Sequence, residues 1–120
     1  LSAATGIDFS LDDLNRAAER EILLARAFNA REGIRRIDEY PYPFHYQLKC
    51  GEKNPQLPYS KYKFSLEDYD KVLDEYYRLR GCDREGIPTR ERLELLELQD
   101  VADDLERRGI RAQNTVSINK

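Results

Sequence analysis

The residues best suited to metal or nucleophilic chemistry are the two cysteines and the single histidine, Cys50, Cys82 and His45. Thiolate and imidazole groups bind zinc or iron–sulfur clusters, but such sites need three or four ligands, usually with a pair two to four positions apart. The cysteines are 32 positions apart and each stands alone. The spacing therefore predicts no metal site. We expect Cys82 to be a half-buried thiol and Cys50 a loop thiol.

Two further kinds of chemistry remain open for these residues. A redox pair of Cys50 and Cys82 would require the chain to bring their Cα atoms within about 7 Å. Catalysis by His45 would require a nucleophile or an acid beside it, and the proline and aromatic residues around it in the sequence supply neither. A packed or surface imidazole is the expected state of His45.

Adjacent carboxylates occur at three places in the chain. A glycosidase-like acid pair needs its two groups on opposite sides of a pocket, which sequence neighbours cannot provide. Acidic residues at helix starts are instead stabilised by the positive end of the helix dipole. We therefore predict a structural role for Asp12, Asp13, Glu67, Asp68, Asp103 and Asp104.

Arginines and tyrosines allow two binding hypotheses. Arg31, Arg35 and Arg36 crowd the end of the first predicted helix, where positive charge complements the helix dipole. Their alternative role is an ion pair or phosphate contact toward other domains. A nucleic-acid platform, with aromatic rings stacked on bases and guanidinium groups on phosphate, could be formed by Tyr69, Tyr76, Tyr77, Arg78 and Arg80. Acidic neighbours would repel phosphate, and Tyr69 and Tyr76 share one helical face with Leu73, so a core role is predicted.

Length and composition limit the function classes further. The 120 residues suffice for one domain, and 20 basic against 23 acidic residues give a net charge of −3 without a basic face for nucleic acid. No apolar run approaches the roughly 20 residues that span a bilayer. Two cysteines are too few for a disulfide framework, so a cytoplasmic setting is expected. The chain has no methionine and begins at Leu1, and we expect a piece of a longer protein.

The first helix is predicted from about Leu11 to Glu32. Ser10 is suited to the N-cap, Asp13 to the third helical position, and Gly33 to the left-handed stop. Apolar residues follow at steps of three and four, which predicts one buried face. That face consists of Leu11, Leu14, Ala18, Ile22, Ala25 and Phe28.

Residues 34–63 are rich in proline and tyrosine, which predicts an ordered loop across the helices, with a short strand at 44–48 as an alternative. A second helix is expected after Ser65, ending at Gly81. Its predicted buried stripe is Leu66, Tyr69, Val72, Leu73, Tyr76 and Leu79.

The last third of the chain is predicted to hold a tight turn and two short helices. Residues 82–86 form the turn, and Thr89 caps a helix that carries Leu93 and Leu96. The final helix starts at about Asp100 and carries Val101, Ala102 and Leu105. Residues 1–109 are thus expected to be a small all-α domain, and residues 110–120 a flexible tail.

Five segments, in their order and spacing, resemble a known family. They are Thr5–Gly6, Arg26–Gly33 (RAFNAREG), Leu73–Gly81 (LDEYYRLRG), Gly86–Glu91 (GIPTRE) and Leu98–Ala102 (LQDVA). Together they resemble the C-terminal end of the tungsten-containing aldehyde:ferredoxin oxidoreductase family. The resemblance covers about residues 3–106.

The resemblance implies a mostly helical last domain of an enzyme that oxidises aldehydes to carboxylates. It also implies a tungsten ion held by two pterin dithiolenes, one [4Fe–4S] cluster and electron transfer to ferredoxin. The family's cluster cysteines, pterin-binding loops and acid–base residues lie upstream of the segment matched by Thr5–Gly6. No residue of this chain is therefore expected to be catalytic, cofactor-binding or metal-binding.

Three positions depart from the family pattern. Relatives usually have an aromatic residue where this chain has Cys82, and often a glycine where it has Glu97. The usual Asp-x-x-Pro-x-Arg loop is here Asp38–Phe44, which contains two tyrosines. These departures leave the substrate branch open.

The sequence thus predicts the structural, inert C-terminal part of a tungsten- or molybdenum-dependent oxidoreductase. It would pack against upstream domains of its own chain, and oligomers remain open. The alternative is a stand-alone helical interaction or oligomerisation module without catalytic activity. Several hundred upstream residues with a cysteine triplet would favour the enzyme, whereas a nearby start codon would favour the module.

Overall fold

The computed structural model describes residues 2–40 and 65–113, and all regular elements in these ranges are helices. They are α1 (Ser2–Thr5), α2 (Leu11–Arg31), the 3₁₀ helix η1 (Arg36–Glu39), α4 (Leu66–Arg80), α5 (Arg90–Leu95) and α6 (Gln99–Arg107). A single antiparallel bridge joins Cys82 and Pro88 within these ranges. The predicted all-α class is confirmed, while the predicted strand at 44–48, Cys50 and His45 lie outside the described residues.

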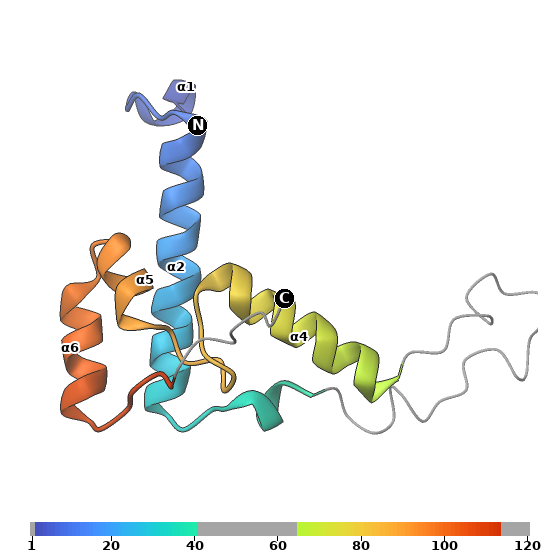
Figure 1. Cartoon of the computed structure of the whole chain (residues 1–120). Coiled ribbons are helices and arrows are strands. Elements are labelled where there is room, and N and C mark those ends of the chain that lie inside the picture. The colour runs from blue at the N-terminus through green and yellow to red at the C-terminus, as the bar shows by residue number, and fades with distance from the viewer. Residues whose placement is uncertain (1, 41–64, 114–120) are drawn as a thin grey trace, which may run out of the picture.

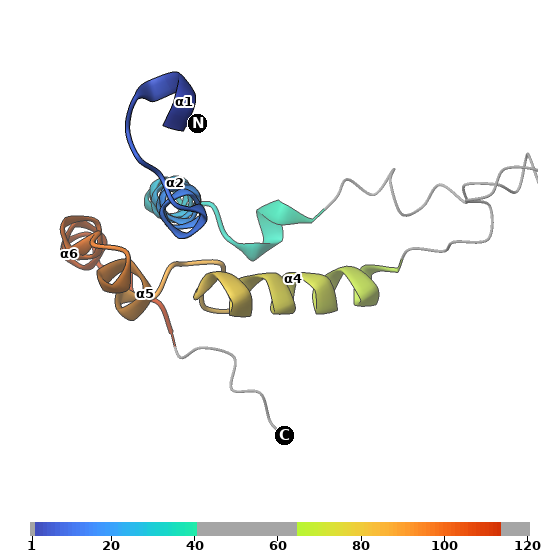
Figure 2. The same ribbon diagram turned by 90° about the horizontal axis from the view of Figure 1, so that it is seen from above.

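α2 and α4 are the two longest helices of the described residues, and the shorter elements lie around them (Figure 1). α5 and α6 lie beside the C-terminal half of α2 (Figure 1). α4 lies on the other side of α2 and extends outward from it, and the view from above shows the same arrangement (Figure 2). The N-terminal half of α2 and the short α1 project beyond this body (Figure 1). No described helix is long and apolar enough to cross a membrane.

α2 begins at the predicted N-cap, Ser10, and ends just before the predicted glycine stop, Gly33. The Ser10 hydroxyl accepts from the Asp13 N–H at 3.1 Å, and the Asp13 carboxylate accepts from the Ser10 N–H at 3.0 Å, which forms a reciprocal capping box. Gly33, at φ +90°, follows the helix end in the left-handed region. The helix therefore ends within one residue of the predicted boundary.

The predicted buried face of α2 is wrong. The side chains that enter the core are Leu23, Ala27 and Ala30, whereas Leu11 is 73% exposed and Phe28 54% exposed. At 3.6 residues per turn, the predicted stripe lies roughly opposite these core residues. α2 carries two apolar faces, and the neighbouring helices cover only the one that periodicity did not select.

α4 shows the same pattern of correct ends and a partly wrong face. The Ser65 hydroxyl caps its start by accepting from the Asp68 N–H, and Gly81 ends it at φ +69°. Leu73 is buried as predicted and Tyr69 and Tyr76 are half-buried, but Tyr77, which is 0% exposed, is the main core residue of the helix. Leu66, Val72 and Leu79 are exposed, so their predicted burial is wrong.

The short helices α5 and α6 complete the core. Thr89 caps α5, and Leu93, Leu96, Ala102 and Leu105 are buried as predicted. The hydrophobic core consists of Leu23, Ala27, Leu73, Tyr77, Cys82, Leu93, Leu96, Leu98, Ala102 and Leu105.

The α5–α6 junction is held by side chains from α2. Arg16 and Arg20 donate to the Leu95 and Leu96 carbonyls at 3.1 and 2.7 Å, at the end of α5. Both arginines also pair with Glu97. Glu97 has φ +59° and is the one described non-glycine residue with positive φ. That conformation explains why a glycine suits this position in the family that the sequence resembles.

The segment after α6 stays attached through residue 113. Ile110 donates its N–H to the Leu105 carbonyl at 2.9 Å and its side chain contacts the core. The Gln113 N–H donates to the Asp83 carboxylate at 2.8 Å. The flexible tail predicted for residues 110–120 stays a prediction for residues 114–120, which lie outside the described ranges.

Candidate functional site

The turn after α4 holds two buried side chains that could carry chemistry, Cys82 and Asp83. Cys82 is 1% exposed, so the prediction of a half-buried thiol understated its burial. Burial raises the pKa of the Cys82 thiol from 9.0 to about 11, although the nearby Arg26 opposes this effect. A neutral, enclosed thiol is a poor nucleophile and metal ligand.

Asp83 is also 1% exposed, and the sequence did not single it out. One carboxylate oxygen accepts the N–H groups of Glu85 and Ile87, both at 2.9 Å, and the other accepts the Gln113 N–H. The carboxylate thus organises the turn and ties the C-terminal segment to it. Three N–H donors offset the cost of burying the charge, so the geometry favours a structural anchor.

A first polar cluster joins α2, η1 and α4 around Glu39. Its Oε1 accepts from Arg26 at 2.7 Å, its Oε2 accepts from the Tyr77 hydroxyl, and its backbone carbonyl accepts from the Tyr69 hydroxyl at 2.6 Å. The Arg26 guanidinium also lies 5.0 Å from the Tyr76 ring centroid and 5.1 Å from that of Tyr77. Every polar group that reaches the core here has a partner.

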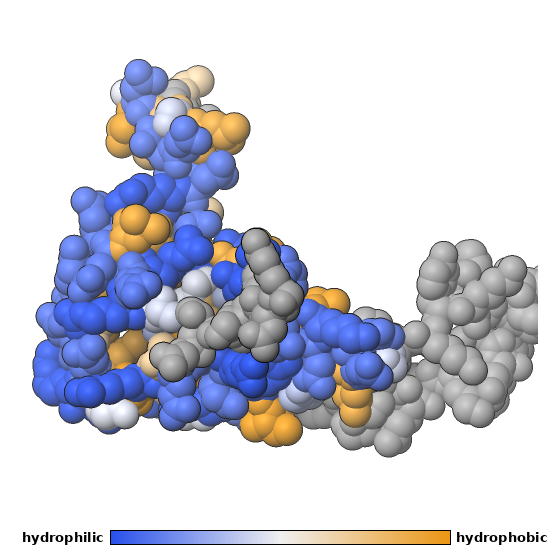
Figure 3. Space-filling model, in the orientation of Figure 1, coloured by the Kyte–Doolittle hydropathy of each residue, from blue (hydrophilic) through white to orange (hydrophobic). Residues whose placement is uncertain are grey.

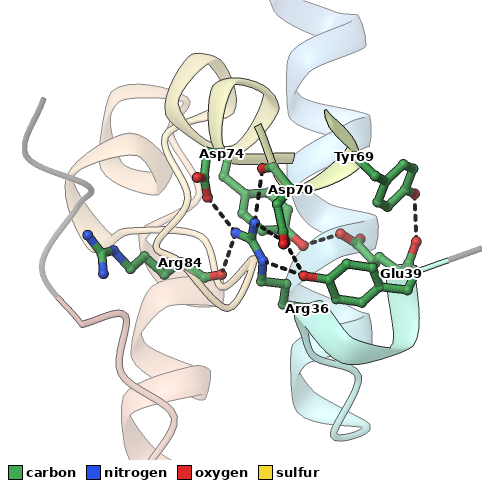
Figure 4. A network of polar contacts seen from close by, with 8 residues as sticks. Arg36, Glu39, Tyr69, Asp70, Asp74 and Arg84 are labelled. Atoms are coloured by element: carbon green, nitrogen blue, oxygen red, sulfur yellow. Dashed lines mark hydrogen bonds and ion pairs between the residues drawn. The ribbon is translucent and has the colours of Figure 1, made fainter. Parts of the chain in front are cut away.

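A second cluster surrounds Arg36 and is drawn in Figure 4. Its guanidinium donates to the carboxylates of Asp74 and Asp70 at 2.6 and 2.9 Å and to the backbone carbonyl of Asp70 at 3.0 Å. The Tyr40 hydroxyl donates to the same Asp70 carboxylate. Arg36 thereby joins η1 to successive turns of α4, and the close-up shows the carboxylates converging on it (Figure 4).

The electrostatics of both clusters favour fixed charge states. Burial and the Glu39 carboxylate raise the pKa of Tyr77 well above its ordinary value, so the phenol stays a hydrogen-bond donor. Burial alone would lower the pKa of Arg36, but hydrogen bonds with Tyr40, Asp70 and Asp74 raise it overall. Hydrogen bonds from Tyr40 and Arg36 lower the pKa of Asp70. None of these shifts brings a group to titrate near neutral pH, as a general acid or base would.

The other candidates from the sequence have structural partners as well. Asp13 and Asp68 bond to the capping serines, and Asp103 and Asp104 form ion pairs with Arg90 and Arg108. Asp13 and Asp68 thus lie in the first turn of a helix as predicted. Asp103 and Asp104 lie beyond the first turn of α6, so their predicted place at a helix start is wrong, although both form ion pairs.

The arginines at the end of α2 do not gather into one site. Arg35 donates to the Ala30 and Ile34 carbonyls, both at 2.8 Å, and so caps the helix end as predicted. Arg31 pairs with Glu32 and lies over the Phe28 ring. With Arg36 held by α4, these guanidinium groups do not converge on a shared phosphate site.

No group of three or more His, Cys, Asp or Glu side chains could hold a metal ion within residues 2–40 and 65–113. The described residues form a small all-α fold in which every buried side-chain polar atom has a hydrogen-bond partner. A family model described as aldehyde ferredoxin oxidoreductase, domains 2 and 3, matches residues 1–98. The chain therefore belongs to the aldehyde ferredoxin oxidoreductase family, as the sequence resemblance predicted.

Relatives with known names cover most of the chain. It is 32% identical over 100 residues to the tungsten-containing aldehyde ferredoxin oxidoreductase of Pyrococcus horikoshii, and 31% identical to that of Pyrococcus abyssi. Each match covers 83% of this chain and 16% of the relative. The chain thus spans about one sixth of the length of the curated relatives that it matches.

A solved structure gives a similar result. The chain resembles part of the active-site complex BamBC of benzoyl-coenzyme A reductase in complex with 1,5-dienoyl-CoA, with a TM-score of 0.72 and 37% identity. The match covers 94% of this chain and 15% of that chain. The fold of the segment is therefore shared with part of a benzoyl-coenzyme A reductase as well as with the Pyrococcus enzymes' family.

Proposed function

We propose that this chain is the C-terminal helical part of an oxidoreductase that oxidises aldehydes to carboxylic acids and passes electrons to ferredoxin. The observation that carries the proposal is the 32% identity, over 83% of the chain, to a tungsten-containing aldehyde ferredoxin oxidoreductase. For the whole protein we propose a tungsten or molybdenum ion held by two pterin dithiolenes, one [4Fe–4S] cluster and a cytoplasmic location.

The described residues do not fit the role of holding either cofactor. They offer no group of three or more metal-ligating side chains, and the Cys82 thiol is enclosed in the core with a raised pKa. We therefore assign no metal-binding role to the described residues, propose that the chain carries no catalytic or cofactor-binding residue, and derive no catalytic step from it. The cofactors would be held by other parts of the protein.

The role that we propose for the chain itself is packing. Residues 1–109 would form a helical unit that rests against the cofactor-bearing part and keeps water from one side of the active site. Exclusion of water strengthens electrostatic interactions at a metal centre. The polar clusters around Glu39 and Arg36 support this role, because their hydrogen bonds and ion pairs join α2, η1 and α4.

Elemental analysis tests whether this chain alone binds the metals that we propose for the whole protein. The 120-residue chain, purified alone, is expected to contain neither tungsten, molybdenum nor iron in stoichiometric amount. Stoichiometric metal in that sample would contradict the packing role.

Activity of the full-length protein tests the enzyme assignment. Aldehyde-dependent reduction of ferredoxin, with formation of the matching carboxylic acid, is the expected result. A full-length protein that contains no tungsten, molybdenum or iron would instead support the stand-alone interaction module.

The match to the benzoyl-coenzyme A reductase structure supports a second class of substrate. Identity to the benzoyl-coenzyme A reductase structure is 37% over 94% of this chain, higher than to the Pyrococcus relatives. The second candidate is therefore an enzyme that acts on an aromatic coenzyme A thioester. Assaying the same protein with benzoyl-CoA and 1,5-dienoyl-CoA beside a set of aldehydes separates the two candidates.

A further inference from the structure

The exposed apolar stripe of α2 is the feature that the fold leaves without a role. Six residues recur on one side of the helix at steps of three and four. They are Leu11, Leu14, Ala18, Ile22, Ala25 and Phe28. Ile22 is half-buried and the other five are exposed, although the opposite side of the same helix is packed in the core. Helices that face solvent on one side normally carry polar residues there.

The N-terminal half of α2 is the part of the helix that is most exposed. All residues from 3 to 18 are exposed, and this half of the helix projects beyond the body of the molecule (Figure 1). Ile7 and Phe9, just before the helix, add apolar surface at this end, and the same end carries apolar surface in the space-filling view (Figure 3). Isolated helical turns are marginally stable in water and gain most of their stability from tertiary packing.

The C-terminal end of the stripe leads into a hollow between α2 and α6. This groove has a volume of about 220 Å³ and is lined mainly by apolar side chains, among them Leu24, Phe28 and Val101. Its charged lining residues are Arg31, Asp100 and Asp104, of which Arg31 and Asp104 form ion pairs with Glu32 and Arg108. A groove of this kind fits an apolar side chain that projects from a partner surface.

We propose that the α2 stripe and this groove form the docking surface for another region of the same full-length polypeptide, which presents an apolar face with one projecting side chain. The inference rests on the proposed function, and it specifies the packing surface. The chain spans 16% of its curated relatives and 15% of the solved relative, so most of such a protein lies outside this segment. Exposed apolar side chains that follow one another along several turns of a helix mark an interaction site.

Cysteine footprinting of the full-length protein tests the proposal. Ala18→Cys and Ala25→Cys place small thiols on the stripe, and Val72→Cys places one on the exposed side of α4 as the matched control. Alkylation at each position is followed by peptide-resolved mass spectrometry and compared with the rate for the same variant in urea. We expect the two stripe positions to be slowed at least about tenfold and Val72→Cys to react at close to its denatured rate.

Each other outcome overturns a stated part of the inference. Rapid alkylation at both stripe positions would show an uncovered face, and equal protection at Val72→Cys would show burial that is not specific to the stripe. Protection that disappears on dilution, as an oligomer dissociates, would make a second copy the occupant. Aldehyde oxidation is measured separately on the unmodified protein, so protection without that activity would refute the proposed function and leave the docking surface standing.

Discussion

Replacement of Gly81 by alanine should destabilise the chain through two effects that the structure separates. Gly81 ends α4 at φ +69°, where a residue with a Cβ atom costs about 1 kcal/mol. An added Cβ would also lie 2.8 Å from both Cβ and Cγ of Arg92, and 2.4 Å from its Nε. Ordinary carbon–carbon contacts are about 3.5–4.0 Å, so these atoms must move apart.

The position of Arg92 makes the second effect costly. The far end of the side chain could swing away, but its Cβ is fixed to the backbone of α5, so that helix must shift. Overpacking of this kind costs about 1–3 kcal/mol. The sum for Gly81→Ala is about 2–4 kcal/mol, a large share of the roughly 5–15 kcal/mol that stabilises a typical domain.

Gly33→Ala is the matched control. Gly33 ends α2 at φ +90°, and an added Cβ would meet no atom within 4 Å. Only the backbone effect of about 1 kcal/mol is expected there. Free energies of unfolding come from urea titration of the 120-residue chain followed by far-UV circular dichroism.

A double-mutant cycle makes the test sharper. In an Arg92→Ala background the contacts with Cγ and Nε disappear, so Gly81→Ala should cost less than in the parent chain, although the approach to Cβ remains. Equal costs for Gly81→Ala and Gly33→Ala, or no coupling with Arg92→Ala, would refute the close approach of Gly81 to the Arg92 side chain described above.

Three further predictions concern Glu97, Asp83 and Cys82. Glu97→Gly should be about 1 kcal/mol more stable than Glu97→Ala in urea unfolding, because both lose the exposed ion pairs and only glycine relieves the left-handed backbone; equal stabilities would contradict this. Asp83→Asn should cost about 1–3 kcal/mol and speed amide exchange at Gln113, since an amide cannot accept all three N–H bonds; unchanged exchange would show that the anchor is dispensable. The pKa of Cys82 rises from 9.0 to about 11 on folding, so the folded state retains the thiol proton longer and stability should fall as pH rises between these values. Cys82→Ala should remove that part of the pH dependence, and an identical pH profile in the variant would refute the assignment.

The helix ends were predictable from sequence because they depend on short-range hydrogen bonds. Ser10 and Ser65 each bond three residues ahead, and the glycine stops at Gly33 and Gly81 need only a permissive backbone. These interactions form within one turn of chain, and no distant residue has to be known. Because their hydrogen bonds are also short-range, the structural roles of Asp13 and Asp68 could be predicted from the sequence.

The buried faces were harder to predict because they depend on which neighbour arrives. α2 is apolar on two sides, and periodicity alone selected the side that carries Leu11 and Phe28. α5 and α6 pack against the other side of α2, so Leu23 and Ala27 are the residues that are buried in the core. Tyr77 was missed in the same way, because the packing of η1 and α2 against α4 selects it over Leu79.

The sequence by itself determined the all-α class, the ends of α2 and α4 and the family, since each rests on local pattern or on residues in a fixed order. It did not indicate η1, which lies within the segment 34–63 that was predicted to be a loop. Only the tertiary structure decided that Glu39 and Arg36 would join η1 to α4 and α2, and that Asp83 would hold the Gln113 backbone 30 positions away. These contacts span long stretches of chain, so no local periodicity reports them. The physical reason is that a buried charge takes whichever partners the completed fold brings within hydrogen-bond distance.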